Sequence, residues 1–263
     1  MVGVLLKKLL RIFESIGDYF SLLGDVIAAC FRRPPEWPLI REQLYHIGVL
    51  SVSVVAITGF TTGFVLAAQS FYQLGEKGLS GITGVLVAKS MLTELGPILT
   101  AFMVIGRVGS SMCAEIGSMQ VTEQIDALKS MAVNPNSYLI APRLIAGSIM
   151  IPLLTLFSTM MGILGGYVLS VYFFNMSANN FFNPMPLHIS IFDLFTGIIK
   201  ATIFGFVLIT VCCYRGLKTS GGAAGVGKAT TQSVVISYIL ILLLDLFLTM
   251  ALNMIYKKIK LGW

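Results

Sequence analysis

Charged residues are scarce in this sequence. Only 11% of the 263 residues are charged and 56% are hydrophobic, whereas a soluble domain carries about 25% charged residues. A chain with so few polar groups cannot cover its surface for contact with water. The composition therefore excludes an ordinary soluble domain and predicts a protein whose main solvent is lipid.

Cysteine and histidine are also rare, with four and two copies. No CxxC pair is present, so neither a metal cluster nor a disulfide framework is predicted, and the cysteines are expected to be small apolar packing residues. His46 and His188 are isolated at the edges of apolar runs. Because no nucleophile–base pair or ligand set is visible, we expect a non-catalytic chain with no cofactor of its own.

The N-terminal segment alternates charged and apolar residues at helical spacing. Acidic residues such as Glu14 and Asp18 interrupt any apolar core of a signal peptide. The pattern over residues 4–31 predicts an amphipathic helix in the membrane interface, and the proline-rich segment 32–38 ends it. We expect two parts, an interfacial helix with its break at 1–40 and a transmembrane domain at 41–263.

Five long apolar runs follow this segment. Each is long enough to cross a bilayer core, which needs about 20 helical residues. Pairs of glycines four residues apart in the first and third runs favour close helix packing. The predicted fold is an all-α integral membrane protein with an N-terminal interfacial amphipathic helix, five transmembrane helices and a cytoplasmic coupling helix. The runs cover residues 46–69, 83–107, 143–173, 190–213 and 231–256.

Lysine and arginine are unevenly distributed between the two sides of the predicted membrane domain. They are frequent before the first run and in the loops after the second and fourth runs, whereas Lys77 alone occupies the opposite loops. Positive residues favour the cytoplasmic side, so the N-terminus is predicted to be cytoplasmic. Lys257, Lys258 and Lys260 on the other side are discordant. The formal net charge of +6 indicates contact with anionic lipid rather than nucleic acid.

Three charged residues fall near the middle of predicted spans: Glu94, Lys200 and Asp245. An ionised group at that depth costs about 2.5–3.5 kcal/mol on insertion scales, so each must face a protein interior or a polar cavity. Lys200 and Asp245 lie at about 20 Å and 21 Å from the cytoplasmic ends of neighbouring antiparallel spans, so they could pair. Glu94 has no evident close partner and is predicted to border a substrate cavity, beside Leu95 and a kink at Pro97.

The segment 107–137 is too polar to span the membrane and too periodic to be coil. Its apolar stripe, which includes Ile116, Ile125 and Leu128, predicts a short helix parallel to the membrane. Such a helix is either a docking site for a cytoplasmic partner or simply a solvated loop helix.

The stretch TELGPILTAFMVIGRVGSSMCAEIGSMQVTEQIDALKSMAVNP, residues 93–135, resembles the core signature of Mla-type permeases. These are membrane subunits of ABC lipid transporters associated with MCE proteins. The family pattern of ELGP, GR-G-S, AEIG-M, EQI-AL and MAV-P is present here at matching spacing. Family members place Arg before the Glu of ELGP, whereas this chain has Thr93, so the resemblance does not carry a headgroup preference.

The resemblance implies a permease that moves phospholipids between the inner and outer membranes and maintains outer-membrane lipid asymmetry. It implies a homodimer in the bacterial inner membrane, a cytoplasmic ABC ATPase dimer that binds ATP and magnesium, and an MCE-domain substrate-binding protein outside. A STAS-domain protein is a further candidate partner. Phospholipid would lie near Glu94, Leu95, Pro97, Lys200 and Asp245. The coupling surface for the ATPase would include Glu115, Gly117, Met119, Glu123, Gln124, Ile125, Leu128 and Met131.

Three other interpretations compete with the permease: nucleotide binding by this chain, a secondary transporter and a scaffold. Residues 222–229, GAAGVGKA, approach a P-loop, but Ala229 replaces the magnesium-binding Ser or Thr and no strand precedes it. We expect a flexible cytoplasmic turn there. An ion- or proton-coupled secondary transporter could use Glu94, but the inverted repeats typical of that class are not visible. A membrane-complex scaffold would not need three charges at mid-membrane depth.

Overall fold

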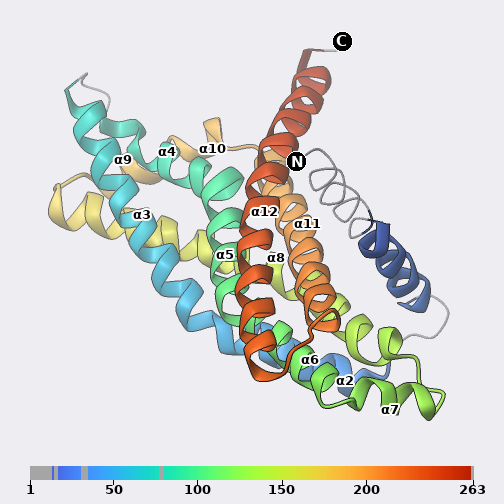
Figure 1. The fold of residues 1–263 in the computed structure, drawn as a ribbon. Coiled ribbons are helices and arrows are strands. Elements are labelled where there is room, and N and C mark those ends of the chain that lie inside the picture. The colour runs from blue at the N-terminus through green and yellow to red at the C-terminus, as the bar shows by residue number, and fades with distance from the viewer. Residues whose placement is uncertain (1–13, 15–16, 31–34, 77–79, 262–263) are drawn as a thin grey trace, which may run out of the picture.

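The computed structural model describes residues 14, 17–30, 35–76 and 80–261. Every secondary-structure element in these residues is helical, and five helical stretches are long and apolar enough to cross a membrane (Figure 1). The five predicted spans and the all-α membrane fold are confirmed. The stretches are Trp37–Gly75, Thr83–Val121, Asn136–Phe173, Ile191–Leu217 and Gly222–Lys258.

The spans are built from α-helices joined by short π-helical or 3₁₀ segments. The α-helices are α2 (Trp37–Ile47), α3 (Val52–Gly75), α4 (Thr83–Ser90), α5 (Gly96–Val104), α6 (Ser110–Val121), α7 (Gln124–Ser130), α8 (Ala141–Val168), α9 (Ala178–Phe182), α10 (Met185–His188), α11 (Ile191–Leu217) and α12 (Gly222–Leu261). The π segments are η3 (Met91–Leu95), η4 (Ile105–Gly109), η5 (Asn136–Ile140) and η6 (Leu169–Phe173), and the 3₁₀ segments are η1 (Val49–Ser51) and η2 (Ser80–Ile82). Helices α2, α6 and α7 lie at one end of the bundle, and α9 and α10 lie at the other (Figure 1).

Helices α3 and α8 pack along each other through glycine. A Cβ atom built on Gly63 would lie 1.8 Å from the carbonyl oxygen of Gly162, and one on Gly165 would lie 2.2 Å from that of Phe60. No side chain fits at such separations, so the two backbones touch directly. The predicted close packing is confirmed for both glycine pairs, and it forms the largest helix–helix contact of the fold.

The described part of the N-terminal helix, residues 17–30, docks on α11. The hydroxyl groups of Tyr19 and Thr210 are 2.6 Å apart, and Lys218 Nζ donates a hydrogen bond of 2.7 Å to Asp18 Oδ2. That hydrogen bond raises the pKa of Lys218 above its usual 10.5. Val26 is fully buried. One face of this helix therefore contacts protein, which the amphipathic pattern alone did not predict. Residues 4–13, 15–16 and 31–34 of the predicted helix and break lie outside the described residues.

Two local predictions are wrong. Residues 107–121 do not form a separate loop helix, because η4 and α6 continue the second span as one helix. Arg107 donates a 2.7 Å hydrogen bond to Ser51 Oγ, and Glu115 pairs with Arg143, so these polar groups have protein partners and the helix has no reason to end. Residues 222–229 are not a flexible turn either, since they form the first turns of α12.

Candidate functional site

Glu94 lies in η3, a π-helical segment within the second span. Gly96 donates its backbone N–H to Met91 O across η3, which is the wider π spacing. Pro97 follows and has no N–H to donate, so the regular α-helical ladder is interrupted at this point. Thr159 on α8 donates a 3.3 Å hydrogen bond to Met91 O. The predicted irregularity at Pro97 is thus realised as a π segment, a feature frequent at functional sites.

Helix α11 approaches this segment through a glycine. A Cβ atom on Gly197 would lie 2.2 Å from the carbonyl oxygen of Leu92. Only glycine permits such a close approach of helix to helix. Lys200 lies one turn further along α11, so the close contact at Gly197 brings its side chain within reach of Glu94.

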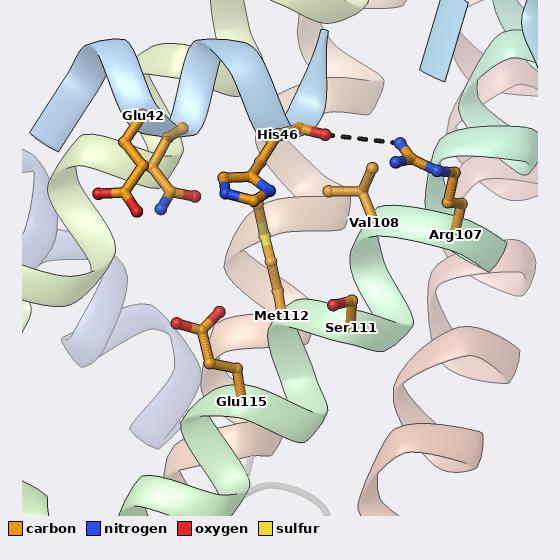
Figure 2. Close-up of a pocket in the computed structure, with 8 residues that line it drawn as sticks. Glu42, His46, Arg107, Val108, Ser111, Met112 and Glu115 are labelled. Atoms are coloured by element: carbon orange, nitrogen blue, oxygen red, sulfur yellow. Dashed lines mark hydrogen bonds between the residues drawn. The ribbon is translucent and has the colours of Figure 1, made fainter. Parts of the chain in front are cut away.

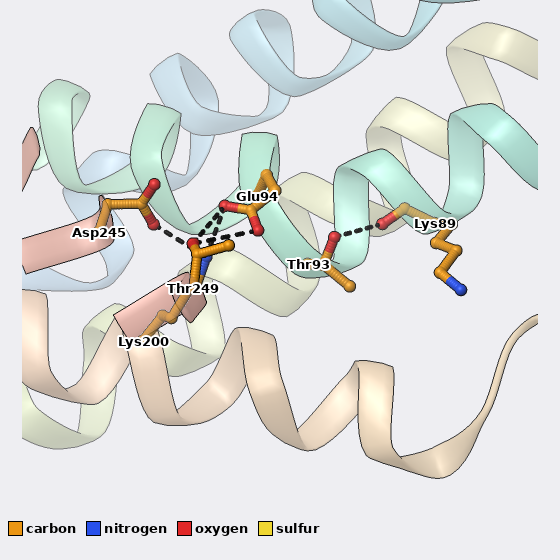
Figure 3. A network of polar contacts seen from close by, with 6 residues as sticks. All are labelled: Lys89, Thr93, Glu94, Lys200, Asp245 and Thr249. Atoms are coloured by element: carbon orange, nitrogen blue, oxygen red, sulfur yellow. Dashed lines mark hydrogen bonds and ion pairs between the residues drawn. The ribbon is translucent and has the colours of Figure 1, made fainter. Parts of the chain in front are cut away.

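Lys200 is the centre of a polar network that joins three spans (Figure 3). Its side chain is fully buried, and Nζ donates hydrogen bonds of 2.5 Å to Glu94 Oε2 and 2.7 Å to Thr249 Oγ1. Asp245 Oδ1 lies 2.9 Å from the same nitrogen. The Thr249 hydroxyl is 3.3 Å from both oxygens of Glu94. The second, fourth and fifth spans are therefore connected by one ammonium group.

The network has more negative than positive groups. Two carboxyl groups surround one ammonium, so the cluster carries a net charge of −1 when all three are ionised. The contact of Asp245 Oδ1 with Lys200 is an ion pair without hydrogen-bond alignment. The side chain of Asp245 is 15% exposed and that of Glu94 is 36% exposed. Glu94 is therefore the residue of the network whose side chain is most exposed.

The sequence predictions for these residues had different outcomes. The Lys200–Asp245 pair is confirmed. The expectation that Glu94 has no close partner is wrong, because it binds the same ammonium. Thr249 was missed, although it lies four residues after Asp245 and so shares its helix face.

Leu95 and Pro97 do not join the network. Leu95 instead lines a cavity of about 460 Å³ on the side facing α3, together with Thr61, Thr62, Val65, Leu66 and Gln69. Glu94 is not among these lining residues. Pro97 is buried. The structure therefore places the predicted lipid-cavity residues on two sides of the second span.

The predicted coupling residues lie at the end of the bundle where α6 and α7 meet (Figure 1). Glu115, Gly117 and Met119 are on α6, and Gln124, Ile125 and Leu128 are on α7. Glu123 joins the helices in a left-handed conformation with φ of 59°.

The two faces of this segment differ in burial. Ile125 is 1% exposed and Leu128 packs against the core, whereas Met131 is 65% exposed. Gln124 and Glu123 are exposed. The outward face thus carries an apolar side chain among polar groups.

A buried arginine fixes α6 at this end. The side chain of Arg143 on α8 is only 5% exposed. It donates a hydrogen bond of 2.8 Å to the carbonyl oxygen of Leu139 and forms a salt bridge of 2.7 Å with Glu115. This role of Arg143 was not predicted from the sequence. Its place in the first turn of an apolar span was the available signal, because a buried cation needs an anion.

A cavity of about 260 Å³ lies beside this salt bridge (Figure 2). Glu42 and His46 reach it from α2, and Glu115 reaches it from α6. Arg107 also lines the cavity, and its guanidinium donates a long hydrogen bond of 3.5 Å to the carbonyl oxygen of His46. Within residues 14, 17–30, 35–76 and 80–261, no group of three or more His, Cys, Asp or Glu is placed to hold a metal ion.

Comparisons with known proteins agree with this architecture. The family model for permease MlaE matches residues 40–251. A probable ABC transporter permease protein of Rickettsia typhi is 38% identical over 244 residues, covering 92% of this chain and 94% of that protein. A probable ABC transporter permease protein of Synechocystis is 37% identical, covering 90% of each chain. The intermembrane phospholipid transport system permease protein MlaE of Haemophilus influenzae is 34% identical over 250 residues, covering 94% of this chain and 95% of that protein. The chain therefore belongs to the MlaE permease family.

Proposed function

We propose that this chain is the permease subunit of an ABC transporter that moves phospholipids between the inner and outer membranes and so maintains outer-membrane lipid asymmetry. The observation that carries the proposal is the Lys200 network within a chain of the MlaE family. A charge cluster at mid-membrane depth is costly and marks a functional path by default. Glu94 offers the exposed polar surface that a headgroup could contact.

The chain is proposed to act with partners. A second permease copy would complete the lipid cavity, and a cytoplasmic ABC ATPase dimer would bind ATP and magnesium. An MCE-domain protein would receive or deliver lipid on the outer side, and a STAS-domain protein is a further candidate. Basic residues gather around the α6–α8 and α11–α12 connections, and this supports a cytoplasmic N-terminus in the bacterial inner membrane. They are Arg107, Lys129, Arg143, Arg215, Lys218 and Lys228.

The ATPase would dock on the surface formed by α6 and α7. Closure of the nucleotide-bound ATPase dimer would push α7, whose buried Ile125 packs against the core. The motion would pass through α6 to η3, because both belong to the one continuous helix of the second span. Displacement of η3 would change the exposure of Glu94 and so admit or expel a lipid.

The first experiment is purification of the chain in mild detergent, followed by mass spectrometry of bound proteins and lipids. We expect an ABC ATPase, an MCE-domain protein and phospholipid to co-purify. A permease that is recovered alone and lipid-free in several detergents would contradict the proposal.

A variant pair tests the docking surface. Leu128→Arg should abolish ATP-dependent lipid transfer, but Leu128 is half-buried, so the fold must be checked. Met131→Arg is the cleaner variant because Met131 is 65% exposed, and it should release the ATPase from a permease that remains folded. Asn179→Arg on α9, at the opposite end of the bundle, is the matched control and should retain the ATPase. Retention of ATPase and transfer by both docking variants would contradict the assigned surface.

A further inference from the structure

Lys89 is a lysine inside the second span, the span that also carries Glu94. It lies on α4, five residues before Glu94, which corresponds to about 7.5 Å along the helix toward the outer side. Its side chain is 50% exposed. Because a lysine within a span is costly unless it faces an anion or reaches the interface, its surroundings are informative.

The protein itself satisfies Lys89 poorly. Among the described residues, its only polar side-chain contact is Asp193 Oδ2 at 3.9 Å, which is too long for a hydrogen bond. The same Asp193 oxygen already accepts hydrogen bonds from Ser190 N at 2.8 Å and Ser190 Oγ at 3.2 Å, as the capping box of α11. The ammonium group is therefore held near the first turn of α11 with its three N–H donors available.

Lys89 and the polar network face one side of the second span. The Thr93 hydroxyl donates a hydrogen bond of 3.0 Å to the backbone carbonyl oxygen of Lys89. The two residues are four apart and therefore lie on one helix face. In Figure 3, Lys89 and Thr93 project from the span toward the side on which α11 runs, and Glu94 follows with its bond to Lys200. Along the path from the outer side, the ammonium of Lys89, which has no hydrogen bond among the described residues, thus precedes the Lys200 network.

We propose that Lys89 binds the phosphate of a phospholipid headgroup and makes this permease selective for phosphate-bearing lipids. The inference rests on the proposed function and names the chemical group that it recognises. A lipid that enters this path brings its headgroup phosphate as the anion, and an ammonium–phosphate hydrogen bond is charge-assisted and strong. Asp193 orients the ammonium without saturating it. Thr93 adds a small polar surface on the same side.

Lipid competition tests the proposal on the purified full chain. Native mass spectrometry would compare phosphatidylethanolamine with diacylglycerol of the same acyl chains, which lacks the phosphate. We expect the wild type to prefer the phospholipid and Lys89→Gln to lower that preference about tenfold or more, as expected for loss of one charge-assisted bond. Lys89→Arg should keep it within about twofold. Lys228→Gln removes the same charge at the cytoplasmic start of α12 and should change nothing.

A second measurement needs no variant. Bound phospholipid should protect Lys89 from an amine-acetylating reagent in the folded wild type, whereas Lys228 should react equally with and without lipid. Diacylglycerol should give no protection. Inorganic phosphate is the remaining probe, and equal protection by it would identify a site for free phosphate and overturn the lipid assignment.

The outcomes separate this inference from the function on which it rests. If the wild type prefers phospholipid but Lys89→Gln binds identically and Lys89 is acetylated at an unchanged rate, Lys89 is only an interfacial anchor and the inference fails alone. If the wild type shows no preference for phospholipid over diacylglycerol, the proposed function fails with it.

Discussion

Replacement of Lys200 by methionine should strongly destabilise the protein. Methionine fills a similar volume but removes the ammonium that Glu94, Asp245 and Thr249 share. Breaking a buried ion pair by removing one partner costs about 3–5 kcal/mol, because the remaining charge is left uncompensated. Here Glu94 is 36% exposed and can be partly solvated, so we expect the lower end, about 3 kcal/mol.

The assay is thermal unfolding in detergent followed by size-exclusion chromatography. Lys228→Met, on an exposed turn of α12, is the matched control and should melt like the wild type. The triple variant Lys200→Met, Glu94→Gln and Asp245→Asn removes all three charges, and it should recover most of the loss. The residual difference would measure hydrogen bonding and packing rather than charge.

Two results would refute the reasoning. If Lys200→Met melts within error of Lys228→Met, the ammonium does not compensate buried charge. If the triple variant is no more stable than Lys200→Met, the loss arises from packing. In either case the network would not be the electrostatic unit that the distances describe.

Three further predictions follow from other contacts. Gly63→Ala should lower the free energy of unfolding by about 1–3 kcal/mol through overpacking at the α3–α8 contact. Gly75→Ala is the control, because a Cβ atom at Gly75 meets nothing within 4 Å. Equal melting temperatures for the two variants would contradict this prediction. Arg143→Met should weaken the link between α8 and α6, and hydrogen exchange in α6 should rise; unchanged exchange would argue against that role. The pKa of Lys218 is raised by Asp18, so the stability from this pair is complete below the unfolded pKa of about 10.5 and is lost as pH rises through the higher folded value. Spin-label distances from residues 17–30 to α11 should therefore lengthen only in strong alkali, and an Asp18→Asn protein should lack that pH step.

The hydrophobic pattern was sufficient to predict the spans. Lipid offers no hydrogen-bond partners to the backbone, so an apolar run of about 20 residues must be helical. The observed helices nevertheless extend beyond the apolar runs, for example to Val121. Polar residues near the membrane surface do not end a helix when protein groups satisfy them, and those partners are distant in sequence.

The partners of Glu94 could not be predicted in the same way. Helical rise placed Lys200 and Asp245 at equal depth because a short loop joins their spans. The relation of Glu94 to Lys200, 106 residues away, depends on which spans touch and on how each is rotated. The close approach at Gly197 fixes that rotation, and no periodicity in the sequence encodes it.

By itself, the sequence determined that the chain has five helices able to cross a membrane and that Glu94, Lys200 and Asp245 fall within them, because both follow from local hydropathy. The tertiary structure decided which charges meet, which ones stay exposed and where the helices end. Those features depend on contacts between segments far apart in the chain, where a glycine-mediated approach or a single buried ammonium selects one arrangement from many of equal hydropathy.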